Sequence, residues 1–198
     1  MKKYIALIIL VLFIDQFSKI YIKTHFRIGE VHQVTNWFQI HFVENPGMAW
    51  GFEFGGKTGK LVLSLFRIGA LFFIGTWLRN AVRNNASFLL KTAIALIFAG
   101  ALGNILDSMF YGLMFNAPAH QVAQFVPFGT GYEGFLFGRV VDMLDFPIWS
   151  GTLPEWIPYF GGKYFKFFNA IFNVADFAIS VGVGIMIVFN KRIFPKEA

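Results

Sequence analysis

The chain has 198 residues, of which 56% are hydrophobic and 14% are charged. A soluble domain usually has about 25% charged residues, so this composition excludes an ordinary soluble protein and indicates an integral membrane protein. The absence of cysteine excludes disulfides, thiolate metal sites and a cysteine nucleophile. The net charge of +6 comes from basic residues beside apolar runs, which indicates topology signals rather than a nucleic-acid-binding surface.

Four apolar segments predict membrane-spanning helices in one compact domain: residues 4–22, 61–78, 88–106 and 173–190. Each approaches the ~20 residues that a helix needs to cross a bilayer. The first segment begins like a secretory signal peptide, but no small-residue cleavage site follows it, so we expect an uncleaved helix. The predicted fold is therefore an integral membrane protein, mainly α, with four transmembrane helices.

If all four segments cross the membrane, the start of the first, the end of the second, the start of the third and the end of the fourth lie on one side. Basic residues gather at these four ends. They are Lys2, Lys3, Arg79, Arg83, Lys91, Lys191, Arg192 and Lys196. The positive-inside rule makes that side, with both termini, cytoplasmic. Segments 23–60 and 111–172 then face outward.

The outward segments have different patterns. VHQVTNWFQIHFVEN (31–45) alternates polar and apolar residues and is rich in β-branched and aromatic residues, which predicts strands of a small extracytoplasmic sheet on the membrane surface. Segment 111–172 is rich in Pro and Gly and is predicted to be a long loop. Four of its aromatic residues suit the lipid headgroup zone: Trp149, Trp156, Tyr159 and Tyr164.

Four aspartates lie in or beside the apolar segments: Asp15, Asp107, Asp142 and Asp176. An acid at the centre of a membrane helix costs roughly 2.5–3.5 kcal/mol on insertion scales, so such residues are functional candidates. For any one of them, a polar contact near the interface is an alternative explanation.

The spacing of these acids adds information. Asn104 and Asp107 share the pattern Asn-x-x-Asp with Asn173 and Asp176. Residues three apart lie on one helical face, so each amide can hold its carboxylate, or the pairs can serve as interhelical polar contacts. Asp15 and Lys19, four apart, predict an ion pair, and its role can be structural or functional.

Asp142 and Asp176 form the natural pair near the outer membrane surface, with Asp145 as an alternative to Asp142. Two carboxylates that share a proton titrate apart, so one can take a proton from water while the other donates to a carbonyl oxygen. This is the arrangement of aspartic proteases. The histidines lack HExxH spacing, which argues against a zinc protease, and adjacent Ser18 and Lys19 do not face each other as a dyad would.

The chain resembles the bacterial lipoprotein signal peptidase (signal peptidase II) family. Five stretches carry the resemblance in the family's order: DQFSK (15–19), ENPGMAWG (44–51), AGALGNILDS (99–108), GRVVDM (138–143) and FNVADFAISVG (172–182). Each stretch is weak alone, but the ordered set covers most of the chain and is specific.

The resemblance implies an intramembrane aspartic endopeptidase of the bacterial cytoplasmic (inner) membrane with its site near the outer face. The catalytic dyad would be Asp142 and Asp176. The substrate would be a diacylglyceryl-modified prolipoprotein, cut just before the lipidated cysteine, and globomycin-type cyclic peptides would inhibit. The site-supporting positions would be Asp15, Lys19, Asn45, Gly47, Asn104, Asp107 and Asn173. We expect no cofactor and no metal, and we expect a monomer among membrane lipids.

The sequence departs from the family at two places. The family usually has Arg after the aspartate of the third span, where this chain has Ser108, and we hypothesise that Arg139 supplies that charge. Segments 115–137 and 147–168 are longer than the family's usual loop and could form a lid or a partner surface.

Two other functions fit an acid-bearing membrane protein. A small transporter or proton-coupled channel would place its acids near the middle of the membrane. A non-enzymatic assembly protein would use the Asn-x-x-Asp pairs as interhelical contacts, and it would keep its function in an Asp142→Asn variant.

Overall fold

The structure is a computed structural model that describes residues 1–46, 56–118, 120–168 and 170–194. Three helical segments are long and apolar enough to cross a membrane: Lys2–His25, Gly56–Arg83 and Phe88–Met114. The first two are α1 and α2. The third consists of α3 (Phe88–Leu106), a π-helical turn η2 (Asp107–Tyr111) and α4 (Gly112–Met114). A shorter apolar helix, α5 (Val174–Val188), is followed by α6 (Asn190–Ile193).

α1 and α2 extend beyond the apolar segments predicted from sequence, whereas α5 is shorter than the predicted segment 173–190. α2 begins five residues before the predicted segment 61–78 and ends five residues after it. Its first and last turns contain lysine, arginine and other polar residues, which lower the hydropathy of the sequence but do not break a helix. α3 begins as predicted, since Ser87 caps it by accepting a hydrogen bond from the Leu90 backbone nitrogen at 3.1 Å. The predicted fourth span corresponds to α5, whose 15 residues rise about 22 Å.

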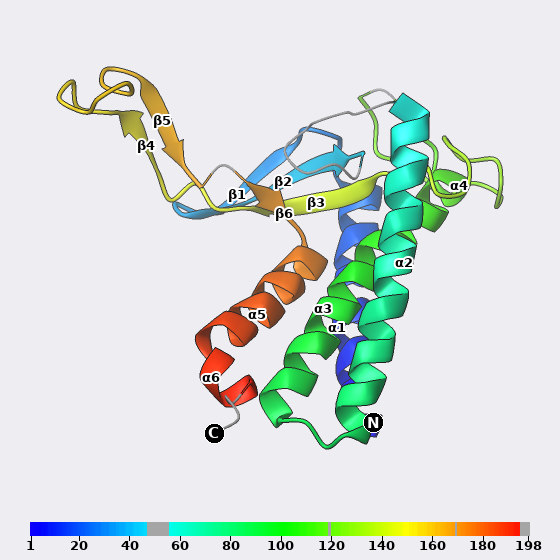
Figure 1. The fold of residues 1–198 in the computed structure, drawn as a ribbon. Coiled ribbons are helices and arrows are strands. Elements are labelled where there is room, and N and C mark those ends of the chain that lie inside the picture. The colour runs from blue at the N-terminus through cyan, green and yellow to red at the C-terminus, as the bar shows by residue number, and fades with distance from the viewer. Residues whose placement is uncertain (47–55, 119, 169, 195–198) are drawn as a thin grey trace.

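α3 is the central helix of the bundle and packs against α1, α2 and α5 (Figure 1). Glycines permit the closest of these contacts. A Cβ at Gly100 would meet the Ala175 carbonyl and lie 2.7 Å from Ile179 Cγ1, and one at Gly103 would lie 2.6 Å from Asp15 Oδ2. Small residues let membrane helices approach closely, and here they bring α1 and α5 onto the same stretch of α3.

The predicted small sheet is present and has four antiparallel strands in the order β1-β2-β3-β6. The strands are β1 (Val31–Thr35), β2 (Phe38–Asn45), β3 (Val140–Asp145) and β6 (Ile171–Phe172). The sheet lies across one end of the helices, opposite the end where α1 begins and α6 ends (Figure 1). Because β6 leads directly into α5, the sheet and this helix are joined with Asn173 between them.

The region predicted as a long loop contains more regular structure than its Pro and Gly content suggested. β4 (Trp149–Thr152) and β5 (Tyr164–Phe167) form a separate antiparallel hairpin with Trp149 opposite Phe167 and Thr152 opposite Tyr164. This hairpin extends away from the helices and the main sheet (Figure 1). The aromatic residues of the two segments favour strands, and the Pro and Gly residues between the segments form the turn that joins them.

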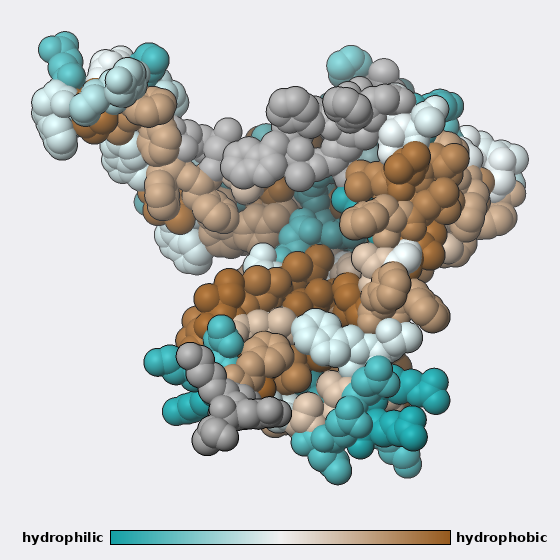
Figure 2. Space-filling view, viewed as in Figure 1, coloured by the Kyte–Doolittle hydropathy of each residue, from teal (hydrophilic) through white to brown (hydrophobic). Residues whose placement is uncertain are grey.

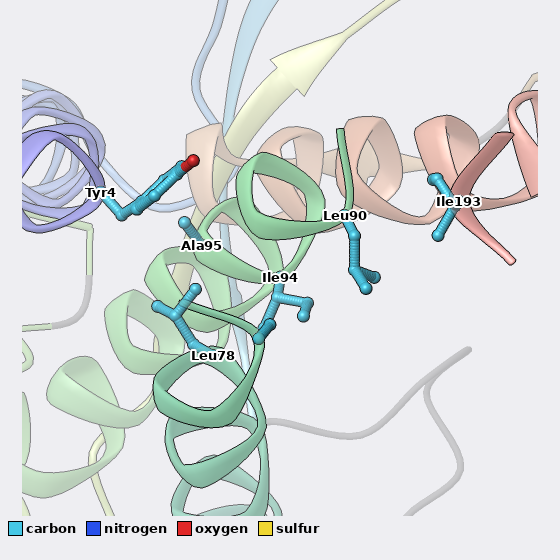
Figure 3. Close-up of a cluster of buried hydrophobic side chains, with 7 residues drawn as sticks. Tyr4, Leu78, Leu90, Ile94, Ala95 and Ile193 are labelled. Carbon is cyan, nitrogen blue, oxygen red and sulfur yellow. The ribbon is translucent and has the colours of Figure 1, made fainter. Parts of the chain in front are cut away.

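Two hydrophobic clusters lie above and below a polar layer. One joins the helices near the chain ends and contains Tyr4, Leu78, Leu90, Ile94 and Ile193 (Figure 3). The other lies under the sheet and contains Ile22, Phe42, Tyr111, Phe115, Val141 and Met143. α1 contributes Tyr4 to the first cluster and Ile22 to the second, and between them it carries Asp15 and Lys19, both fully buried.

Candidate active site

Asp142 and Asp176 come together from β3 and the first turn of α5. Asn173 joins them: its Nδ2 donates to Asp142 Oδ1 at 2.6 Å, and its Oδ1 accepts from the Asp176 backbone nitrogen at 2.9 Å. Asp176 Oδ2 in turn accepts from the Asn173 backbone nitrogen at 3.4 Å. Asn173 and Asp176 thus form a capping box, which fixes the start of α5 and the direction of the Asp176 carboxylate.

Asn104 holds Asp176 from the side of α3. Its Nδ2 donates to Asp176 Oδ1 at 2.8 Å, and its Oδ1 accepts from Asn173 Nδ2 at 3.1 Å. Asn45 Nδ2 on β2 donates to Asp142 Oδ2 at 3.3 Å. Each carboxylate of the pair is therefore oriented by amide groups from other elements.

Beneath the pair lies a fully buried ionic cluster. Lys19 Nζ is 3.0 Å from Asp15 Oδ2 and 2.9 Å from Asp107 Oδ2, and it donates to Asn104 Oδ1 at 2.9 Å. Gln16 Nε2 donates to Asp107 Oδ1 at 2.8 Å and to Asp15 Oδ2 at 3.0 Å. Buried charges are costly unless paired and hydrogen-bonded, and here the two acids share one cation and one amide.

The two acids of this cluster each hold the backbone beside one of the paired aspartates. Asp15 Oδ1 accepts from the Ala175 backbone nitrogen at 2.9 Å, next to Asp176. Asp107 Oδ2 accepts from the Val141 backbone nitrogen at 3.4 Å, next to Asp142. Lys19 connects both acids, so one buried side chain couples the positions of the two elements that carry the pair.

The environments of the paired carboxyl groups differ. Burial, and then the nearby Asp176 carboxylate, raise the pKa of Asp142 to about 7. Asp176 is partly exposed and lies in the first turn of α5, where the Asn104 amide and the capping box hold its carboxyl group. The two carboxyl groups of the pair therefore lie in different surroundings, Asp142 buried and Asp176 partly exposed.

Asp145 lies apart from the pair. Three residues along a strand reverse the side-chain direction, so Asp142 and Asp145 point to opposite faces of β3. Asp145 Oδ2 accepts from Gln39 Nε2 at 2.6 Å and lies 3.6 Å from His41 Nδ1. The geometry therefore favours Asp142 over Asp145 as the partner of Asp176.

Arg139 precedes β3 and its ion pair is with Glu44, at 3.2 Å from Nη1 to Oε2. Glu44 also pairs with Lys23 of α1. The charge of Arg139 thus acts at the edge of the sheet, about three strand residues from Asp142, or roughly 10 Å along β3. Gly47, the remaining predicted position, lies outside the described residues.

Three interacting residues were missed in the sequence. Gln16 links Asp15 to Asp107, Glu44 links Lys23 to Arg139, and Arg67 of α2 is attracted by the Asp176 carboxylate. Arg67 had a detectable signal, because a lone arginine inside an apolar span is as costly as the aspartates that were noticed. Gln16 and Glu44 had no such signal.

The face of α2 that carries Arg67 is directed at the site. One turn earlier, Ser64 Oγ donates to the Leu136 carbonyl at 3.2 Å, and Lys60 Nζ donates to the Phe137 carbonyl at 2.6 Å. Residues 60, 64 and 67 share one helical face. The segment that Lys60 and Ser64 contact, residues 136–137, leads directly into β3.

A hollow opens beside this face. Figure 2 shows hydrophilic residues at the bottom of a hollow bounded by apolar surface of α2 and α5 and by the sheet above. The outer faces of both helices carry exposed apolar residues, among them Phe66 and Phe177. Among the described residues, no group of three His, Asp or Glu side chains is placed to hold a metal ion.

Comparisons with known proteins identify the family of the chain. The family model for signal peptidase (SPase) II matches residues 7–191. A lipoprotein signal peptidase of Porphyromonas gingivalis is 48% identical over 192 residues, which cover 96% of this chain and 84% of that protein. One of Amoebophilus asiaticus is 37% identical, covering 96% and 78%.

The fold is shared with solved structures of a bacterial membrane enzyme. A bacterial membrane enzyme with 25% sequence identity matches 100% of this chain and 93% of its own chain, with a TM-score of 0.61. The matched range includes both paired aspartates and the whole buried cluster. The chain therefore belongs to the signal peptidase II family, whose members are peptidases.

Proposed function

We propose that the protein is an intramembrane aspartic endopeptidase that removes signal peptides from diacylglyceryl-modified prolipoproteins, cutting just before the lipidated cysteine. The observation that carries the proposal is the pairing of Asp142 and Asp176 through Asn173. The names of its relatives supply the substrate class. Acid–base chemistry needs carboxyl groups that are held in fixed positions, as these hydrogen bonds hold Asp142 and Asp176. A polar contact between helices alone would not need so many of them.

In the proposed reaction, a water molecule lies between the two carboxyl groups. The Asp176 carboxylate removes a proton from the water as the oxygen attacks the peptide carbonyl carbon, while protonated Asp142 donates to the carbonyl oxygen. As the tetrahedral intermediate collapses, the C–N bond breaks and Asp176 passes its proton to the leaving amine of the lipidated cysteine. A hydroxyl of the intermediate returns a proton to Asp142 as the new carboxyl group forms. No covalent enzyme intermediate forms.

The peptide bond would reach the pair through the hollow between α2 and α5 (Figure 2). Asp176 is hydrogen-bonded to Asn104, ten residues before the Met114 end of the third helical segment, or about 15 Å along the helix. The site is therefore recessed from the outward end of the bundle. We propose that α5 is the fourth membrane helix, that the membrane is the cytoplasmic (inner) one and that both termini are cytoplasmic.

The test is cleavage of a purified diacylglyceryl-modified prolipoprotein by the wild type and by the Asp142→Asn and Asp176→Asn variants. We expect the wild type to cut the lipidated form and both variants to lose at least 10³-fold in kcat, since either loss removes the acid or the base. Asp145→Asn is the matched control on the other face of β3 and should retain activity.

An unlipidated prolipoprotein and a globomycin-type cyclic peptide complete the experiment. The first should remain uncut and the second should block cleavage of the lipidated form. Near-wild-type activity in either dyad variant would remove the aspartic mechanism. If the wild type cut nothing, the transporter and assembly functions would become the leading candidates.

A further inference from the structure

The hairpin formed by β4, β5 and the turn between them, residues 149–167, is called the aromatic arm here. It has no strand neighbour beyond its own pair within the part of the chain that is described. A two-stranded hairpin alone is at best marginally stable in water, and this one extends away from the bundle (Figure 1). Another surface is needed to stabilise it.

The arm exposes an unusual number of aromatic side chains. The exposed ones are Trp149, Trp156, Tyr159, Phe160, Tyr164, Phe165 and Phe167. Trp156 is 80% exposed and Tyr159 is 92% exposed. Its sequence contains one acid, Glu155, and two lysines, Lys163 and Lys166. Trp and Tyr rings with a few cations suit the boundary between lipid headgroups and acyl chains better than they suit water.

The backbone of the arm supports this interpretation. Tyr159 has φ 65° and Phe168, just after the arm, has φ 58°. Bulky residues rarely adopt this left-handed conformation, and glycine or asparagine would adopt it more easily. An aromatic ring displayed at the tip on a strained backbone indicates that the ring itself has a contact to make.

The base of the arm is fixed at the outer end of a membrane-facing helix. Phe146 stacks on Phe172 with ring centroids 5.6 Å apart and on Phe38 at 5.0 Å. Phe172 immediately precedes Asn173 and α5, whose first turn exposes Phe177. Stacked aromatic rings therefore connect the base of the arm to the strand that leads into α5.

We propose that the aromatic arm binds the headgroup layer of the outer leaflet and thereby fixes the depth of the main sheet at the membrane surface. The arm joins β3 at one end and β6 at the other, so it acts on both elements that lead to the paired aspartates. The binding partner is the lipid surface itself. The position of the arm is tested without the peptidase activity, whereas its effect on cleavage rests on the proposed function.

Tryptophan quenching in lipid nanodiscs of phosphatidylethanolamine and phosphatidylglycerol tests the position of the arm. One variant keeps Trp156 alone, with the other four tryptophans replaced by Phe. Two controls keep only Trp77, on α2, or only a Gln121→Trp residue on an exposed outward loop. We expect lipids brominated near the headgroup to quench Trp156 at least half as strongly as Trp77. Aqueous iodide should quench Trp156 at least threefold less than the Gln121→Trp residue.

Quenching of Trp156 that matches the Gln121→Trp control for both quenchers would overturn the proposal and leave the arm available to an aqueous protein partner.

A second measurement uses a triple variant, Trp156→Ser, Tyr159→Asn and Phe160→Ser, with Asn chosen because it tolerates the left-handed backbone at position 159. We expect prolipoprotein cleavage to fall at least threefold in nanodiscs and to stay unchanged in detergent. An equal fall in both media would show a structural role and contradict the proposal.

Discussion

Two arginines can supply positive charge to the paired aspartates, and their contacts distinguish them. The Asp176 carboxylate attracts the charge of Arg67, whereas Arg139 is paired with Glu44 at 3.2 Å. Ser108, at the position where the resemblance led us to expect Arg, donates to the Asn104 carbonyl at 3.1 Å. We infer that Arg67 supplies from α2 the charge that Ser108 cannot supply from η2.

The prediction compares Arg67→Ala with Arg139→Ala. Loss of Arg67 removes a partly buried charge beside the anion of the pair, so kcat/KM should fall about 10- to 100-fold, equivalent to about 1.4–2.8 kcal/mol. Arg139→Ala should cost less than fivefold, because it breaks an ion pair in which Arg139 is 45% exposed. The opposite order of effects would restore the sequence-based hypothesis for Arg139.

The raised pKa of Asp142, about 7, predicts a pH dependence. When folding raises the pKa of a carboxyl group, the folded protein holds its proton up to the raised pKa and loses it above that value. The general acid is therefore lost as pH rises, and kcat/KM should fall up to about tenfold per pH unit above roughly pH 7. A profile flat from pH 6 to 9 would place the proton elsewhere. For stability the relevant window lies lower, between the usual pKa of 3.8 and the raised value of about 7: the unfolding temperature should fall as the pH rises through this range, with no further loss from this group above it.

At the scale of elements, the contact of α3 with α5 depends on the absence of a side chain at Gly100. A Cβ there would meet the Ala175 carbonyl and approach Ile179 to 2.7 Å. Gly100→Val should therefore cost about 1–3 kcal/mol of folding stability and should also reduce activity, because Ala175 adjoins Asp176.

Gly184 is the matched control, since a Cβ at this position of α5 has no neighbour within 4 Å. Gly184→Val should leave the unfolding temperature in detergent within a degree or two, whereas Gly100→Val should lower it by several degrees. Equal effects of the two variants would show that helix propensity, rather than the close approach, decides the stability of this contact.

The sequence predicted the elements whose signals are local. Apolar runs located α1, α2, α3 and α5, and alternation located β1 and β2. The π-helical turn at Asp107 was not predictable, because such turns have no composition of their own and arise from packing at functional sites. The β4–β5 hairpin was predicted as loop because its Pro and Gly residues cluster in the turn and obscure two short strands.

At the scale of the whole molecule, the candidate site was predicted only as a set of residue types. The spacing of Asn173 and Asp176 predicted a shared helical face, and the structure shows the stricter geometry of a capping box. The bonds from Asp15 to Ala175 and from Asp107 to Val141 join residues far apart in the chain. Periodicity describes one element at a time, so contacts of this kind lie beyond it.

The orientation of the whole molecule gives the last prediction. α1 begins and α6 ends at the end of the bundle that carries Arg79, Arg83 and Lys191, and the sheet lies at the other end (Figure 1). Because the chain has no cysteine, a single introduced thiol reports its position without background. Asn84→Cys, in the turn between α2 and α3, and Gln121→Cys, in the segment after α4, are both at exposed positions.

In intact cells with a permeabilised outer membrane, a membrane-impermeant maleimide should label Gln121→Cys and leave Asn84→Cys unmodified. Disrupting the inner membrane should then make both thiols equally reactive, which controls for intrinsic reactivity. The reverse pattern would place the basic end outside, contrary to the positive-inside rule, and labelling of both thiols before disruption would contradict a spanning bundle. The expected pattern would place the sheet, and with it the approach to Asp142, on the side where lipidated substrates emerge.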